Sequence, residues 1–248
     1  MNILKSLSLL FFLVSIKSCK KAEDRRCVKS AGKETTQEID MPFFDKLELH
    51  ENIEFILVQD TINKVILTGG LNLLNEVKLS VSDNQLKVVN KNKCDFLRSY
   101  KKVIKAEIHF SNLSFLNYHG TEVLTNRGTL NLPFINIAII NSSGSVDLKL
   151  NSNHVSANSF GAYGDFKLSG TTKTADFHIN SNGFCKTNDL IVTESMTVLS
   201  NTVGLMMVNA HNIALKAETK NGGNIIYKGT PLLIVFNRIG KGNLIQEK

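Results

Sequence analysis

Asn117-Tyr118-His119-Gly120 opens the stretch, 117–240, that decides the fold, because a pattern of asparagine, two residues and glycine keeps returning along it. The six pairs are Asn117 and Gly120, Asn141 and Gly144, Asn158 and Gly161, Asn180 and Gly183, Asn201 and Gly204, and Asn237 and Gly240. With a degenerate copy, Asn221-Gly222-Gly223, the 120 residues from Asn117 to Asn237 divide into six steps, so the mean period is 20. A fixed period of this size predicts a solenoid, in which each unit buries its apolar face only against its neighbours.

Each repeat has an alternating strand before the corner and a second short strand after it. Ile137 and Ile139 alternate with other residues before one corner, and Val146, Leu148 and Leu150 do so after it. Glycine reaches positive φ without steric cost, and asparagine is the next most tolerant residue. We therefore predict an all-β, single-domain, right-handed parallel β-helix, or β-solenoid, with irregular coils of about 20 residues. The rival fold is a β-sandwich, which also has short strands and frequent turns.

Strand patterns begin well before the repeats. Residues 43–67 alternate apolar and polar side chains, and Val77 to Val88 predicts a hairpin that turns at Ser82-Asp83-Asn84-Gln85. The segment 91–102 is the most basic part of the chain. One short cluster of this kind is typical of a solvated loop or an edge strand, so we predict no nucleic-acid partner.

The N-terminus resembles a bacterial lipoprotein signal. A positive residue, Lys5, precedes a ten-residue apolar run, 7–16, which is too short to span a bilayer. The run leads to Cys19, the predicted lipid attachment site, through which the chain would contact a membrane. We expect a signal peptide at 1–18, a tether at 19–38 and the folded domain at 39–248. Without residues 1–18, 27 basic residues face 22 acidic ones, which leaves a net charge of +5. This charge affects solubility rather than fold.

From the entry sequence Phe44-Asp45-Lys46-Leu47, the hairpin and the glycine corners, the chain resembles the putative autotransporter adhesin family with the head GIN domain. The closing stretch 223–231, Gly-Asn-Ile-Ile-Tyr-Lys-Gly-Thr-Pro, looks like the terminal motif of that family. The resemblance covers roughly residues 40–246. It implies a β-helix-like body similar in shape to pectin lyases but without their catalytic set. From the lipoprotein signal we expect an outer-membrane lipoprotein of the cell envelope that is periplasmic or surface-exposed.

The cysteines and histidines are the residue types that could form a disulfide or a metal site. Cys27 and Cys94 look like a recurring subfamily pair, and they are candidates for a disulfide in an oxidising compartment. Cys185 is expected to be a small buried hydrophobe. The six histidines show no metal-ligand spacing along the chain, so we predict no metal site and no cofactor.

The leading functional hypothesis is a non-enzymatic, adhesin-like binding or scaffold module, whose ligand is a glycan, a protein or another copy of itself. The alternative is a carbohydrate-active enzyme that uses Asp147 and Asp165, because paired carboxylates hydrolyse glycosidic bonds. Aspartate is also a common turn residue, so we predict no catalytic residues. A third hypothesis is a purely structural envelope component.

Overall fold

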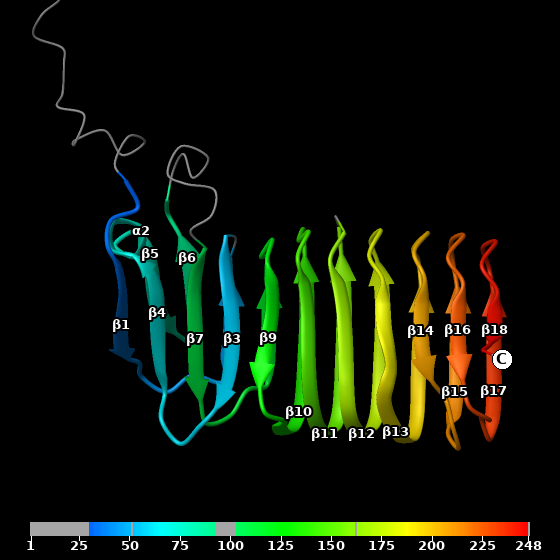
Figure 1. The fold of residues 1–248 in the computed structure, drawn as a ribbon. Coiled ribbons are helices and arrows are strands. Elements are labelled where there is room, and N and C mark those ends of the chain that lie inside the picture. Colours follow the sequence, from blue (N-terminus) through cyan, green and yellow to red (C-terminus); the bar gives the residue numbers. More distant parts are fainter. Residues whose placement is uncertain (1–29, 51, 93–102, 162, 248) are drawn as a thin grey trace, which may run out of the picture.

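The computed structural model describes residues 30–50, 52–92, 103–161 and 163–247, and in these ranges the protein is an all-β solenoid of about seven turns. Coils of about 20 residues stack along one axis, from β1 (Glu34–Asp40) at one end to β17 (Leu233–Arg238) at the other (Figure 1). Successive coils pair as parallel strands, which confirms the predicted solenoid and rules out the β-sandwich. No helix among these residues is long and apolar enough to cross a membrane.

The N-terminal half consists of shorter strands and one helical turn. Its elements are β2 (Lys46–Leu49), β3 (Ile53–Gln59), β4 (Lys64–Gly70), α2 (Leu71–Leu74), β5 (Val77–Ser82), β6 (Gln85–Asn90), β7 (Ile104–Phe110), β8 (Phe115–Tyr118) and β9 (Val123–Arg127). The predicted hairpin is confirmed as the antiparallel pair β5 and β6. Its two turn residues, Asp83 and Asn84, have φ of 51° and 59°, which is the left-handed geometry that a two-residue hairpin requires.

The repeats form longer strands. They are β10 (Leu130–Ile140), β11 (Ser145–Phe160), β12 (Asp165–Asn180), β13 (Cys185–Ser200), β14 (Met206–Asn209), β15 (Ala214–Thr219), β16 (Ile225–Lys228), β17 and β18 (Leu244–Gln246). In β10, β11 and β12 the burial pattern shows two consecutive outward-facing residues, such as Asn153 and His154, at which the strand bends from one side of the coil to the other.

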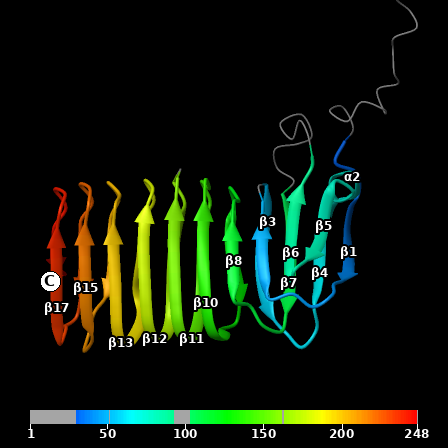
Figure 2. The same cartoon turned by 180° about the vertical axis from the view of Figure 1, so that it is seen from behind.

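The coil therefore has two faces, joined by this bend and by the glycine corner. We call face I the stack of β6, β2, β8, the second halves of β10–β13, β15 and β17. Face II is the stack of β1, β4, β7, β3, β9, the first halves of β10–β13, β14, β16 and β18. Figure 2 shows the same stack turned by 180°, with β6, β8, β15 and β17 of face I labelled.

The core lies between the two faces, and alternate side chains of each strand point into it. Phe166 on face II and Phe177 on face I are both buried, with ring centroids 5.9 Å apart. Tyr118 is fully buried, and its hydroxyl donates a hydrogen bond to the backbone carbonyl of Glu122. Burial raises the pKa of the Tyr118 hydroxyl well above its ordinary value.

Antiparallel strands close the N-terminal end. β4 pairs antiparallel with β7, and β1 then pairs antiparallel with β4, so the parallel stack stops there. Leu73 and Leu74 of α2 are buried at this end. Residues 34–38, which the sequence analysis assigned to the tether, form most of β1. This strand has no continuous apolar pattern because it is held mainly by backbone pairing, and its charged side chains suit an exposed edge.

The corners of neighbouring coils stack so closely that the backbone of one coil leaves no room for a side chain on the next, and glycine is needed there. A Cβ at Gly183 would lie 2.1 Å from the carbonyl oxygen of Gly164, and a Cβ at Gly204 would lie 2.4 Å from that of Gly183. The same holds at Gly223 and Gly242, at 2.2 Å and 2.1 Å from the preceding glycine carbonyl. Buried hydroxyls, such as those of Thr202 and Thr219, donate to these carbonyls from inside the coil. We call Gly164, Gly183, Gly204, Gly223 and Gly242 the glycine column.

Candidate functional site

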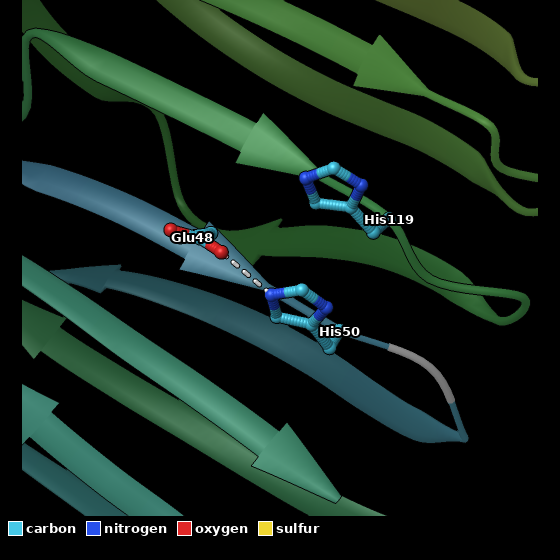
Figure 3. A group of neighbouring side chains, drawn as sticks. All are labelled: Glu48, His50 and His119. Atoms are coloured by element: carbon cyan, nitrogen blue, oxygen red, sulfur yellow. Dashed lines mark hydrogen bonds and ion pairs between the residues drawn. The ribbon is translucent and has the colours of Figure 1, made fainter.

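One polar cluster on face I joins residues far apart in the sequence. β2 and β8 are parallel neighbours, and Leu49 is in register with Tyr118, so His50 and His119 follow side by side. Backbone hydrogen bonds hold both positions: His119 N–H donates to the Leu49 carbonyl at 2.8 Å, and His50 N–H donates to the Val88 carbonyl at 3.1 Å. Figure 3 shows the two imidazole rings beside the carboxylate of Glu48.

The side chains of this cluster are close together and partly exposed. The two histidine rings are stacked, with centroids 4.8 Å apart and planes 7° from parallel. His50 Nε2 lies 2.7 Å from Glu48 Oε1, and Lys87 Nζ lies 2.7 Å from the same oxygen. Gln85 Nε2 donates to the other carboxylate oxygen, Oε2, at 2.6 Å. We call Glu48, His50 and His119 the histidine–glutamate cluster.

Electrostatics keep the Glu48 carboxylate ionised. Partial burial alone would raise the pKa of Glu48, but hydrogen bonds from Lys87 and His50, together with their charges, outweigh burial. The pKa of Glu48 is therefore lowered, and the group offers a negative charge to any cation near face I.

This cluster is the only group of three histidine, cysteine, aspartate or glutamate side chains within ligand reach of one another in the part of the chain that the structure describes. Ligand spacing along the chain does not reveal this cluster, because metal-binding motifs place their ligands a few residues apart, whereas His50 and His119 lie 69 positions apart. Only the register of β2 against β8 brings them together, and no local motif carries that information.

The C-terminal end of the solenoid has an apolar surface. All six residues of β17 are exposed, including the run Leu233-Ile234-Val235-Phe236, and Leu232 and Ile239 beside it are exposed as well. Ile234 and Phe236 stack on the buried Leu215 and Ala217 of β15, so they continue core columns that end in solvent. Among the described strands, β17 pairs only with β15 and β18 only with β16. We call residues 232–239 the C-terminal strand surface.

The two aspartates weighed as an enzymatic pair have other partners. Asp147 Oδ2 forms an ion pair with Lys167 Nζ at 3.0 Å. Asp165 Oδ1 accepts the backbone N–H of Phe184 at 2.6 Å, which makes it a turn residue. Both side chains lie on the outer surface of face II, and Lys167 is in register with Asp147 itself. Each of the two aspartates is therefore engaged by a partner of its own rather than by the other aspartate.

A second polar feature lies at the bend between the faces. Asn131, Asn151 and Thr171 stack there: Asn151 donates to Asn131 Oδ1 at 3.2 Å, and Thr171 donates to Asn151 Oδ1 at 2.9 Å. A shallow hollow of about 320 Å³ is lined by six residues of this bend: Asn131, Leu132, Pro133, Asn151, Ser152 and Asn153.

The predicted asparagine corners separate into two positions. Asn117, Asn158 and Asn237 lie within strands on one outward-facing row of face I. Asn141, Asn180 and Asn201 lie at strand ends, where Asn201 donates to Asn180 Oδ1 at 3.3 Å.

The predicted glycines separate in the same way. Gly183 and Gly204 belong to the glycine column, and Gly144 N–H donates to the Gly120 carbonyl at 3.2 Å just before the column begins. Gly161 and Gly240 lie outside the column. Among the twelve predicted corner residues only Asn141, with φ of 49°, and Gly161, with φ of 68°, have positive φ. Close backbone approach therefore explains most of the glycines.

The cysteine predictions have different outcomes. Cys19, Cys27 and Cys94 lie outside the described residues, so the lipid attachment and the disulfide stay predictions. Cys185 is a free, fully buried thiol, as predicted. Burial raises the pKa of the Cys185 thiol to about 12, partly offset by its hydrogen bond with Thr187.

Comparisons with known proteins agree with this architecture. The sequence model of a family described as "Putative auto-transporter adhesin, head GIN domain" matches residues 43–231. A crystal structure of a putative adhesin from Bacteroides fragilis is 24% identical, with a TM-score of 0.79 over 87% of this chain and 97% of that one. A putative lipid binding protein from Parabacteroides distasonis is 21% identical, with a TM-score of 0.66 over 88% of this chain and 98% of that one.

A putative adhesin from the same species, Parabacteroides distasonis, is 23% identical, with a TM-score of 0.59 over 87% of this chain and 98% of that one. At these identities the likeness shows the fold alone. No curated protein matches the chain.

Proposed function

The chain belongs to the head GIN domain family of putative auto-transporter adhesins, and from this premise we propose that it acts as a non-enzymatic, adhesin-like binding module, held to the cell envelope by lipid on Cys19. The observation that carries the proposal is the C-terminal strand surface. A contiguous exposed apolar patch on a soluble domain is typical of a protein–protein contact site. The occupant we propose is the same surface on a second copy of the chain.

The position of this surface supports an adhesive role. A lipid on Cys19 would hold the chain by its N-terminal side, and β1 marks that end of the solenoid, whereas β17 lies at the opposite end (Figure 1). A contact through the C-terminal strand surface would therefore form away from the anchor. Two molecules on facing membranes, or on neighbouring cells, would meet end to end.

Self-association fits the chemistry of the surface. Residues 232–236 carry no charge, so their apolar side chains suit an identical apolar run across a twofold axis. β17 is an edge strand, and its outer backbone groups can pair antiparallel with a second β17. The N-terminal end is a poor alternative partner, because the antiparallel strand β1 carries Glu34, Glu38 and Asp40.

The size of the end face is sufficient for a weak dimer. A six-residue strand is about 20 Å long and facing sheets lie about 10 Å apart. Side chains add roughly 5 Å on each face, so the end of one coil offers on the order of 400 Å² per copy. The buried total then falls in the size range of weak, transient interfaces. We therefore expect a reversible dimer that assembles at micromolar concentration or above.

The test combines solution association with cell adhesion. Sedimentation velocity of the purified protein from 1 to 100 µM (about the range for a weak interface) should show a monomer–dimer equilibrium. Val235→Lys, in the centre of the surface, should give a monomer. Val123→Lys, a similarly exposed valine on β9, should leave the dimer unchanged. Cells that display the wild-type chain should aggregate, and cells that display Val235→Lys should not. A monomer at every concentration, without cell aggregation, would overturn the proposal.

The lipid anchor needs its own measurement. Cells grown with a radiolabelled fatty acid should label the wild-type protein and release an unlabelled Cys19→Ser variant from the membrane fraction. Equal labelling of the two proteins would exclude Cys19 as the attachment site. Self-association could still be correct in that case, so the two parts of the proposal fail separately.

A further inference from the structure

We propose that the histidine–glutamate cluster binds a divalent transition-metal ion of the Zn²⁺ class, with one ligand atom each from Glu48, His50 and His119. The three side chains offer ligand atoms that all lie within 4.8 Å of one another. Spacing along the chain predicts no metal site, whereas the folded chain brings these three ligands together. The inference is also independent of the proposed self-association, because the cluster lies at the ends of the paired strands β2 and β8, several coils away from β17 (Figure 2).

The ligand types select the class of metal. Two imidazoles and one carboxylate are the donor set that zinc and its neighbours accept, whereas calcium and magnesium prefer oxygen ligands alone. Three protein ligands leave one coordination position open. Water, or a donor group of a bound partner, would complete a tetrahedral site.

The geometry is close to that of a metal site and needs a small adjustment. In a tetrahedral zinc site the ligand atoms lie about 2.0–2.2 Å from the metal and therefore roughly 3.4 Å from one another. Glu48 Oε1 and His50 Nε2 are already 2.7 Å apart, a distance that can open without moving the backbone. The imidazole of His119 must turn out of its parallel stack with His50, so that both rings aim a nitrogen at one point.

The surroundings support this arrangement in two ways. The parallel ladder of β6, β2 and β8 fixes the backbone of Glu48, His50 and His119, so binding would cost little backbone ordering. Gln85 donates to Glu48 Oε2 and leaves Oε1 directed at His50. Such a second contact, which orients a metal-binding carboxylate, is a regular feature of metal sites.

Lys87 provides the sharpest consequence of the proposal. Its ammonium lies 2.7 Å from Glu48 Oε1, the oxygen assigned to the metal, so Lys87 and the metal compete for one ligand. The Lys87 side chain is 45% exposed and flexible enough to turn into solvent when a metal binds. Removing the Lys87 charge should therefore tighten metal binding at this cluster. The affinity of zinc for a histidine elsewhere on the surface should not change.

A second cluster shows what a structural histidine looks like in this protein. Both ring nitrogens of His109 are engaged, with Asp60 Oδ2 at 2.9 Å and Glu107 Oε1 at 3.0 Å. Arg127 holds both oxygens of Glu107, at 3.0 Å and 2.6 Å. No ligand atom remains available there, so we assign no metal to it.

The experiment is isothermal titration of ZnCl₂ into the purified protein, followed by the same titration of five variants whose folding is checked by circular dichroism. His50→Ala, His119→Ala and Glu48→Gln should each weaken binding by at least about tenfold, as the loss of metal-site groups usually does. Lys87→Met should tighten binding by a fewfold or more. His178→Ala, a control on the same face in β12, should bind as the wild type does.

Two results would overturn the proposal. Wild-type zinc affinity in His119→Ala would show that any bound zinc uses other groups, the cysteines included. Unchanged or weaker binding in Lys87→Met would show that the metal does not replace the ammonium at Glu48. The lysine variant also keeps the test valid if a histidine variant fails to fold, because the Lys87 side chain is 45% exposed and lies outside the buried core.

Discussion

Replacement of Gly183 by alanine tests the physical reason for the glycine column. The added Cβ would lie 2.1 Å from the Gly164 carbonyl oxygen, and the obstructing atom is backbone, which cannot rotate away as a side-chain end can. Neighbouring coils would have to separate locally, at a corner where stacked strands lie about 4.8 Å apart. We expect Gly183→Ala to lower the free energy of unfolding by about 2–3 kcal/mol, the upper part of the range for overpacked sites.

Thermal unfolding measures this loss. A destabilisation of 1 kcal/mol shifts the melting temperature of a domain of this size by about 2–4 °C, so Gly183→Ala should melt about 4–12 °C below the wild type. Gly222→Ala is the matched control, because a Cβ there would meet no atom within 4 Å and its φ is not positive. It should be neutral or stabilising by up to about 1 kcal/mol, through the loss of chain entropy in the unfolded state. Equal melting temperatures for the two variants would refute the close-approach argument.

Three further predictions concern single buried or partly buried groups. Tyr118→Phe removes the hydroxyl that donates to the Glu122 carbonyl, and it should lower the free energy of unfolding by about 1–2 kcal/mol in denaturant titrations; a change below about 0.5 kcal/mol would contradict this. The Cys185 thiol, whose pKa burial raises to about 12, should not react with a thiol reagent at pH 8 until denaturant is added; the denatured Cys185→Ala variant should show one thiol fewer. The pKa of Glu48 is lowered on folding, so its contribution to stability is present above the unfolded pKa of about 4.3 and is lost as the pH falls through the folded value. Glu48→Gln should therefore flatten the acid side of the stability profile, and an unchanged profile would show that the carboxylate gains nothing on folding.

The asparagine–glycine spacing predicts the coil length correctly, but its pairs fall at two different positions within the coil. The spacing of asparagine and glycine identified the period, since any residue type that recurs once per coil reports the coil length. The pairs Asn158–Gly161 and Asn180–Gly183 nevertheless occupy different places, because Asn158 lies inside a strand and Asn180 at a strand end. This shift explains the irregular steps between motifs. Gly164 and Gly242 belong to the glycine column without belonging to any asparagine–glycine pair, and Gly223 belongs only to the degenerate copy. The physical requirement at the column is a missing Cβ, not a neighbouring asparagine.

The histidine–glutamate cluster was beyond the reach of sequence patterns for a different reason. β3 to β7 lie between β2 and β8 in the chain, and they add a hairpin and antiparallel strands that obey no 20-residue period. The contact between His50 and His119 therefore requires β8 to pair with β2, and tertiary packing rather than local sequence determines this pairing. Residues 34–38, predicted as part of the tether, form most of β1 for a related reason: an edge strand that pairs through its backbone needs no apolar alternation.

The two ends of the solenoid differ in a way that bears on the choice between adhesion and a purely structural role. At the N-terminal end, the core is covered by α2 and by antiparallel strands whose outermost member carries acidic side chains. At the C-terminal end, the parallel stack stops with Ile234 and Phe236 exposed by 40% and 36%. A parallel edge with apolar side chains invites pairing with another chain, and natural proteins usually blunt such edges with charge or a covering segment. A scaffold that needed only stability would gain from blunting β17 in the same way as β1. The retention of an uncharged apolar run at that edge is therefore more consistent with a surface used for contact, which is the distinction that Val235→Lys and Val123→Lys measure.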